Sequence, residues 1–219
     1  MNTFPKQDDV IHSVLKGALL AKKNYTSWTC DELYLSSAPS NFIRVHIAQE
    51  LAKLDEKPEI FMDATISDIL RCSLPNRRDF KTFMKENSLQ EDTFSLTLDE
   101  RFLHQNDNDS VSRVLISVKS GVRNVKEEYK EEIHKMCKMI SRQIKEDSTL
   151  DYCLFAFYLD ISNTARKKAA KRIDEIIASF DAVVSQYNNL KSDFKGGEIT
   201  SIENIGEWCV GCYIIEPTV

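Results

Sequence analysis

The chain has 219 residues, of which 42% are hydrophobic and 29% charged, enough apolar sequence for one sizeable folded domain. Its formal net charge of −5 at pH 7 excludes binding to nucleic acid through overall charge alone, although an acidic protein can carry a local basic patch. The first residues do not resemble a secretory signal and the longest apolar runs, such as Cys153–Leu159, are too short to cross a bilayer, so we expect a cytoplasmic protein without membrane partners.

The N-terminal part of the chain is expected to be helical. Apolar residues recur at helical spacing over Val10–Lys23, and a polar link containing aromatic residues follows as far as Pro39. Ser40 is a suitable N-cap for a second helix, which should end near residues 55–58. We therefore divide the chain into an N-terminal helical extension, residues 1–39, and an α/β domain, residues 40–219.

The middle of the chain combines strands with short helices. Glu59–Ile66 alternates like a strand, and residues 68–87 predict one or two short helices. Thr93–His104 and Val111–Lys119 are strand candidates, and the sequence Gln-Asn-Asp-Asn-Asp-Ser between them is typical of a turn. The two segments should form a β-hairpin.

The last hundred residues predict two long helices and two strands. An amphipathic helix should run from Val125 to Ile144, with both of these residues facing inward. Asp151–Ile161 is almost continuously apolar, as in a strand buried on both faces. A second helix should begin after a cap at residues 162–164, followed by a loop over residues 191–204 and a final strand over 207–216. Together, these elements predict a mixed β-sheet flanked by helices.

Between Ser40 and Ile161, the order of helix, three strands, helix and strand resembles the core of the restriction-endonuclease-like (PD-(D/E)xK) nucleases. The resemblance implies an aspartate on the second strand, and an acidic residue followed two positions later by a lysine on the third. In that family the carboxylates hold Mg²⁺, which offsets the charge that develops during phosphodiester cleavage, while the lysine helps position the attacking water.

Carried onto this sequence, the resemblance assigns catalytic roles to Asp99, Lys119 and Glu50, and metal binding to Asp99, Glu50 and Asp63. The position two residues before Lys119 is Ser117, which departs from the family because a hydroxyl is a much poorer Mg²⁺ ligand than a carboxylate. The alternative is that these charged residues are ordinary surface residues, and that Lys119 simply reaches solvent at a strand end.

A basic cluster should lie at the start of the second long helix, where cations oppose the helix dipole. Such a cluster favours contact with nucleic-acid phosphates or an acidic partner, and the alternative is a solvated helix face. Its members are Arg166, Lys167, Lys168, Lys171 and Arg172.

The segment Trp208–Cys212 resembles the Trp-Cys-x-x-Cys motif of thioredoxin-like oxidoreductases, but here it lies inside an expected strand with no helix after it. A zinc site would need two further ligands close by, so we interpret Cys209 and Cys212 as structural. The sequence also has no glycine-rich phosphate loop, which argues against a kinase, a GTPase or a nicotinamide enzyme.

These observations indicate a nuclease-like protein of the kind found in mobile-element or phage-defence systems. Its site is degenerate, so we expect an activity that has been lost or relocated; an active site would carry out Mg²⁺-dependent phosphodiester hydrolysis of nucleic acid. The alternative is a non-catalytic subunit that keeps the fold and binds a protein partner or a second copy of itself.

Overall fold

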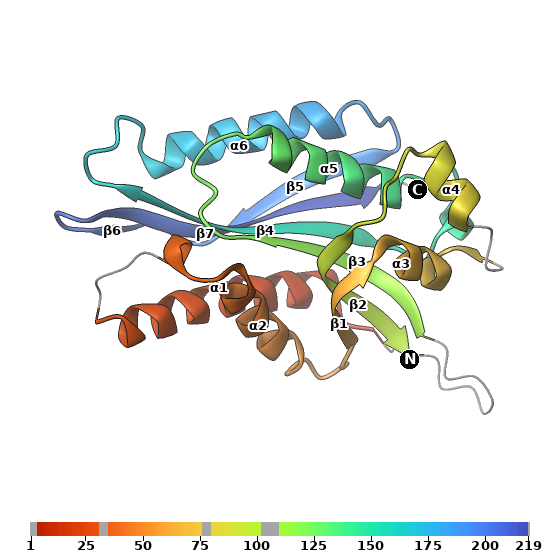
Figure 1. Cartoon of the computed structure of the whole chain (residues 1–219), viewed down its shortest axis with the longest axis horizontal. Coiled ribbons are helices and arrows are strands. Elements are labelled where there is room, and N and C mark those ends of the chain that lie inside the picture. Colours follow the sequence, from red (N-terminus) through yellow and green to blue (C-terminus); the bar gives the residue numbers. More distant parts are fainter. Residues whose placement is uncertain (1–3, 31–34, 76–79, 102–109, 219) are drawn as a thin grey trace.

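The computed structural model describes residues 4–30, 35–75, 80–101 and 110–218, and these form a mixed seven-stranded sheet with helices on both faces (Figure 1). In chain order the elements are α1 (Gln7–Trp28), α2 (Ser40–Leu51), β1 (Glu59–Thr65), α3 (Ile66–Ser73), α4 (Phe80–Glu86), β2 (Thr93–Arg101), β3 (Ser110–Lys119), α5 (Glu127–Ile140), β4 (Tyr152–Ser162), α6 (Ala169–Val184), β5 (Leu190–Gly196), β6 (Thr200–Ile202) and β7 (Gly206–Pro217). The α/β class predicted from the sequence is confirmed.

The strands follow the order β1-β2-β3-β4-β7-β5, with β6 paired to β7. Only β3 and β4 of this described sheet are parallel, and α5 connects them; the other pairs are antiparallel. In Figure 1, α1 and α2 lie on one face of the sheet, while α5 and α6 lie on the other. The predicted β2–β3 hairpin is present, although the expected strand end at His104 and most of the turn lie outside the described residues.

The core is centred on β4, whose residues are buried from Tyr152 to Ile161, as its apolar sequence predicts. Phe155 projects from β4 towards α5 and α6, where its ring contacts Tyr129 and Phe180 in edge-to-face geometry. The residues of β3 and β4 that pair in register with Phe155 and its alternate neighbours therefore point to the α5 face.

The N-terminal segment belongs to the same core. Val10 and Val14 on α1 are fully buried, and α1 packs against α2 so closely that a Cβ atom on Gly17 would lie 2.5 Å from the Cα of Ile47. At its start, α1 also reaches the end of β7, where the Gln7 side chain donates a hydrogen bond of 3.0 Å to Glu216. The division at residue 39 stays a prediction, but residues on both sides of it share one hydrophobic core.

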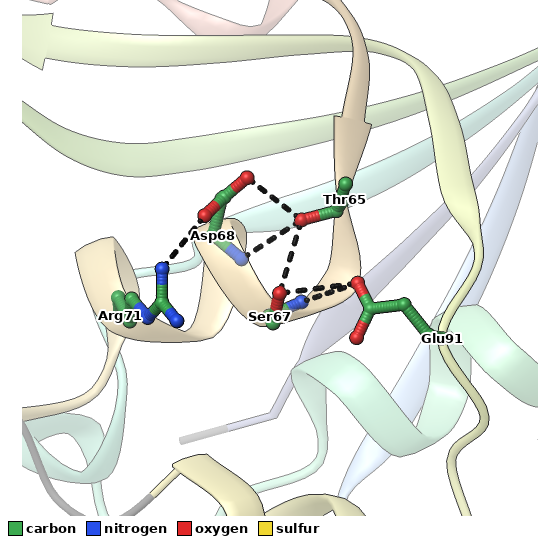
Figure 2. A network of polar contacts seen from close by, with 5 residues as sticks. All are labelled: Thr65, Ser67, Asp68, Arg71 and Glu91. Atoms are coloured by element: carbon green, nitrogen blue, oxygen red, sulfur yellow. Dashed lines mark hydrogen bonds and ion pairs between the residues drawn. The ribbon is translucent and has the colours of Figure 1, made fainter.

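The junction of β1 and α3 is fixed by a polar network (Figure 2). Thr65 caps α3 by accepting a hydrogen bond from the backbone N–H of Asp68 at 3.2 Å, and Asp68 in turn holds Arg71 at 3.1 Å. The hydroxyl of Ser67 donates to Glu91 at 3.1 Å. Because Glu91 directly precedes Asp92 and strand β2, this network fixes the chain where it enters the sheet.

Several predicted boundaries are wrong. The expected loop over residues 191–204 contains β5 and β6, because β5 is an edge strand whose exposed polar residues hide the strand pattern. Helix α6 begins at Ala169, several residues later than the predicted cap at residues 162–164, because β4 continues to Ser162 through its pairing with β7. Val125 and Ile144 lie outside α5 and are exposed rather than inward-facing.

Candidate functional site

The structure does not bring Asp99 and Lys119 together. Asp99 on β2 pairs with Ser112 on β3, whereas Lys119 is the last residue of β3, seven positions further along. At about 3.3 Å per residue, this separates the two positions by about 23 Å along the hairpin. The two residues therefore cannot share one metal ion.

Asp99 lies in a separate, mainly apolar pocket of about 290 Å³ beside α3. Asp99 is 4% exposed; one carboxylate oxygen accepts a hydrogen bond from Ser110 at 3.3 Å, and the other has no hydrogen-bond partner among the residues that the structure describes. Burial raises the pKa of Asp99, the hydroxyls of Ser112 and Ser110 offset part of this rise, and the negative charge of Glu59 adds to it.

Glu50 is held elsewhere, on α2 and the face of the sheet opposite α5 (Figure 1). Its buried carboxylate lies 2.8 Å from the ammonium of Lys16 and also pairs with Lys53. Hydrogen bonds from Lys16 and then Lys53 hold the pKa of Glu50 below its ordinary value despite the opposing effect of burial. The contacts of Glu50 thus tie α1 to α2 and do not reach Lys119.

Lys119 lines a polar pocket of about 410 Å³ at the end of β3, which we call the Lys119 pocket. Of the predicted site residues, Asp63 also lines it. The wall contributed by α5 carries Glu128, Glu132 and Lys135, which recur at helical spacing and so lie on one side of the helix. The remaining lining residues are Arg44, Asp92, Thr93, Ser95, Ser117, Val118, Ser120, Lys126 and Tyr129.

Hydroxyl groups from both strands of the hairpin, β2 and β3, line this pocket. Leu96 pairs with Ile116, and the same antiparallel register places Ser95 beside Ser117. Ser95 accepts a hydrogen bond of 3.0 Å from the backbone N–H of Val118. Ser117, which lines the pocket from β3, is 2% exposed. Both strand positions thus present hydroxyls at the place where the resemblance requires carboxylates.

The carboxylates that do line the pocket are already matched with cations. Asp63, whose backbone has a positive φ of 55°, pairs with Arg44. Asp92 and Glu132 share the ammonium of Lys135, at 2.7 Å and 2.9 Å.

The electrostatic surroundings of Asp92 favour its charged form. Desolvation alone would raise the pKa of Asp92, but the hydrogen bonds from Lys135 and from the backbone N–H of Thr93 outweigh it. The charges of Lys135 and Lys119 lower the pKa further, so that it lies below its ordinary value. Asp92 is therefore ionised at neutral pH, and its charge interacts favourably with that of Lys119.

The residues present do not fit the Mg²⁺ site that the resemblance implies. Within the described part of the chain, no three His, Cys, Asp or Glu side chains are grouped so that they could hold one metal ion. Ser95 and Ser117 offer only weak ligands for Mg²⁺, and the ammonium of Lys135 lies between the two nearest carboxylates of the pocket, those of Asp92 and Glu132.

The basic cluster flanks the start of α6, and part of it is engaged within the protein. Lys167 pairs with Glu175 at 2.8 Å, and Arg172 donates to the backbone carbonyl of Arg123 at 2.6 Å. Glu207 accepts the first N–H of the helix, that of Ala169, at 2.8 Å and so supplies the negative charge that the helix dipole favours.

Four members of the cluster, Arg166, Lys167, Lys168 and Lys171, are exposed to solvent. The ammonium of Lys168 lies 3.2 Å from the backbone carbonyl of Asn163. The role of the cluster in binding nucleic acid stays a prediction.

Cys209 and Cys212 are buried on β7 and both are free thiols. Burial raises the pKa of each thiol to about 12, so neither is a thiolate at neutral pH. This environment agrees with the structural role predicted for them.

Sequence reasoning missed Asp92, Glu132 and Lys135. On α5, Glu132 and Lys135 each directly precede a buried apolar residue, Ile133 and Met136. A charged stripe running beside the apolar stripe of this helix was the available signal, and it indicates charges held at the edge of the core rather than in open solvent.

No helix within the described ranges has both the length and the apolar character needed to span a membrane. None of the protein families, curated proteins or solved structures with which the chain was compared matches it.

Proposed function

We propose that this chain is a nuclease-like protein that binds the phosphodiester backbone of nucleic acid in the Lys119 pocket without hydrolysing it. The order α2, β1, β2, β3, α5 and β4 supports the resemblance to restriction-endonuclease-like proteins, with α3 and α4 inserted after β1. The observation that carries the proposal is the chemistry of the pocket: it keeps the strand-end lysine but has serines where metal-binding carboxylates are required.

Lys119 is suited to binding an anion. It has no ion-pair partner among the described residues, whereas the other cations of the pocket, Arg44, Lys126 and Lys135, are each paired with a carboxylate. The hydroxyl of Ser117 lies two positions before it on the same face of β3 and is available as a donor. An ammonium with a neighbouring hydroxyl is a common way to hold a phosphate oxygen.

The absence of suitable carboxylates explains why binding is expected without cleavage. Hydrolysis of a phosphodiester needs a divalent ion or an equivalent group to offset the developing charge, and it needs a water made nucleophilic. Asp92 and Glu132 are paired with Lys135, so neither is free to activate water.

The test combines binding and cleavage. Fluorescence anisotropy with labelled single-stranded DNA, duplex DNA and RNA should detect salt-dependent binding, and Lys119→Met should weaken it by about tenfold, the loss of one charged hydrogen bond. Lys57→Met, which removes the same charge from an exposed position outside the Lys119 pocket, is the matched control and should leave binding unchanged.

Incubation of the same nucleic acids with Mg²⁺ or Mn²⁺ should give no products. Cleavage by the wild-type protein that disappears in Lys119→Met would overturn the proposal in favour of an active nuclease. Binding that is equally strong in both lysine variants would show that the Lys119 pocket is not the binding site.

A protein-interaction subunit is the second candidate, and the edge of the sheet favours it. Strand β1 pairs only with β2 within the described residues, and its Phe61 and Met62 side chains are 45% and 42% exposed. An exposed edge strand with apolar side chains can pair with a strand of another chain. Failure to bind any nucleic acid, together with co-purification of a partner that is lost in Phe61→Ser, would support this function instead.

A further inference from the structure

The ammonium of Lys135 is the meeting point of two carboxylates from separate elements. Asp92 precedes β2 and Glu132 lies one turn before Lys135 on α5, yet their oxygens lie 2.7 Å and 2.9 Å from the same nitrogen. The Lys135 side chain is only 13% exposed, and its ammonium lies 4.7 Å from the centre of the Phe94 ring. This lysine is therefore held in place by packing as well as by charge.

Two carboxylates that converge on one point from different elements are the kind of ligand pair that a divalent cation selects. Here that point is filled by a cation that belongs to the chain. We propose that Lys135 substitutes for the divalent ion: its ammonium blocks metal binding between Asp92 and Glu132, and it makes ligand binding in the Lys119 pocket independent of Mg²⁺.

The charges of the pocket support this assignment. Without Lys135, Asp92 and Glu132 would place two negative charges near Lys119, and their repulsion would oppose the approach of a phosphate. With Lys135 in place, the two lysines balance the two carboxylates, which leaves the hydrogen-bonding groups of Lys119 and Ser117 available to an anion. Phosphate binding beside Lys119 rests on the proposed function, whereas the exclusion of a metal ion depends on the geometry of Lys135 alone.

Lys135→Met tests the exclusion of a metal ion separately from phosphate binding. It removes the charge but keeps an unbranched apolar side chain over Phe94. Binding of Mn²⁺, measured by electron paramagnetic resonance without any nucleic acid, should be undetectable in the wild-type protein. Lys135→Met should bind one Mn²⁺ ion at least about tenfold more tightly than wild type. The substitution removes the ammonium group and so leaves the carboxylates of Asp92 and Glu132 free to bind the ion. The added substitution Asp92→Asn should remove this binding, and the control Lys57→Met should behave as wild type.

A second measurement uses labelled single-stranded DNA. Wild-type binding should be the same in EDTA and in Mn²⁺, whereas binding by Lys135→Met should be weak in EDTA and should recover when Mn²⁺ is added. If no variant binds nucleic acid, the proposed function fails, while the Mn²⁺ titration still tests the role of Lys135.

Two results would overturn the inference: wild-type protein that binds Mn²⁺ and loses it on Asp92→Asn substitution, or a folded Lys135→Met protein that binds none. Circular dichroism reports whether the variant is folded. If Lys135→Met does not fold, Lys135→Gln serves as the second variant, and the wild-type titration can refute the inference without either.

Discussion

The buried carboxylate of Asp99 is expected to destabilise the folded protein at neutral pH. One of its oxygens is buried with no partner in the described part of the chain, and the other accepts a long hydrogen bond of 3.3 Å, while Glu59 repels the charge. A poorly satisfied buried polar group costs about 1–3 kcal/mol in proteins. Asp99→Asn removes the charge but leaves a buried amide, so we expect the lower end of that range: a gain of about 1 kcal/mol at pH 7.

The pH dependence follows from the raised pKa of Asp99. In the pH range between the ordinary value of 3.8 and the raised value, the folded protein binds more protons than the unfolded chain. Stability therefore falls as the pH rises through that range, and the advantage of Asp99→Asn should be present at pH 7 and should shrink towards pH 4.

Urea denaturation followed by circular dichroism at both pH values measures this effect. A gain of about 1 kcal/mol should move the midpoint by about 0.5 M for a slope of about 2 kcal/mol/M. Asp55→Asn changes an exposed carboxylate and should have no effect at either pH. A variant that is less stable than wild type at pH 7, or a difference that does not depend on pH, would refute this account of Asp99.

Three further predictions concern other parts of the fold. Glu50→Gln should lower the free energy of unfolding by about 1 kcal/mol at pH 7, as measured by urea denaturation. Because the pKa of Glu50 is lowered in the folded protein, this loss should vanish as the pH falls below the ordinary value of 4.5. A loss that persists in acid would contradict this account. Gly17→Ala should lower stability by about 1–2 kcal/mol in the same assay, since overpacking against the Ile47 backbone outweighs the better helix propensity of alanine; an increase in stability would show that α1 and α2 can separate freely. Cys209 and Cys212 should react with a thiol reagent only after denaturation, whereas rapid reaction in the native protein would contradict their burial and their raised pKa.

The sequence predicted those elements whose apolar pattern reflects burial. Strand β4 is apolar throughout because it is buried throughout, and α5 shows a clear helical stripe because only one of its faces meets the sheet. Strand β5 was missed because it lies at the edge of the sheet, where polar side chains are tolerated and a strand resembles a loop.

The candidate site was only partly predictable for a different reason. Lys119 and Asp63 do line one pocket, but the choice of Asp99 depended on the register of the hairpin, which shifts between Leu98 and Asp99. The charged stripe of α5 indicates that Glu132 lies at the edge of the core, but no local pattern indicates that it lies beside Lys119. Asp92 and Glu132 come together only because α5 crosses the sheet beside the start of β2.

The contact between α1 and β7 has a consequence for how this protein is made. Helix α1 buries one side against neighbours that include β7, and Gln7 bonds to Glu216, so part of the surface of α1 has no partner until β7 has been synthesised. Contacts between such distant residues slow folding and leave apolar surface exposed in the meantime. During synthesis this helix can pack early on α2, but the surface that meets β7 stays uncovered until that strand has left the ribosome.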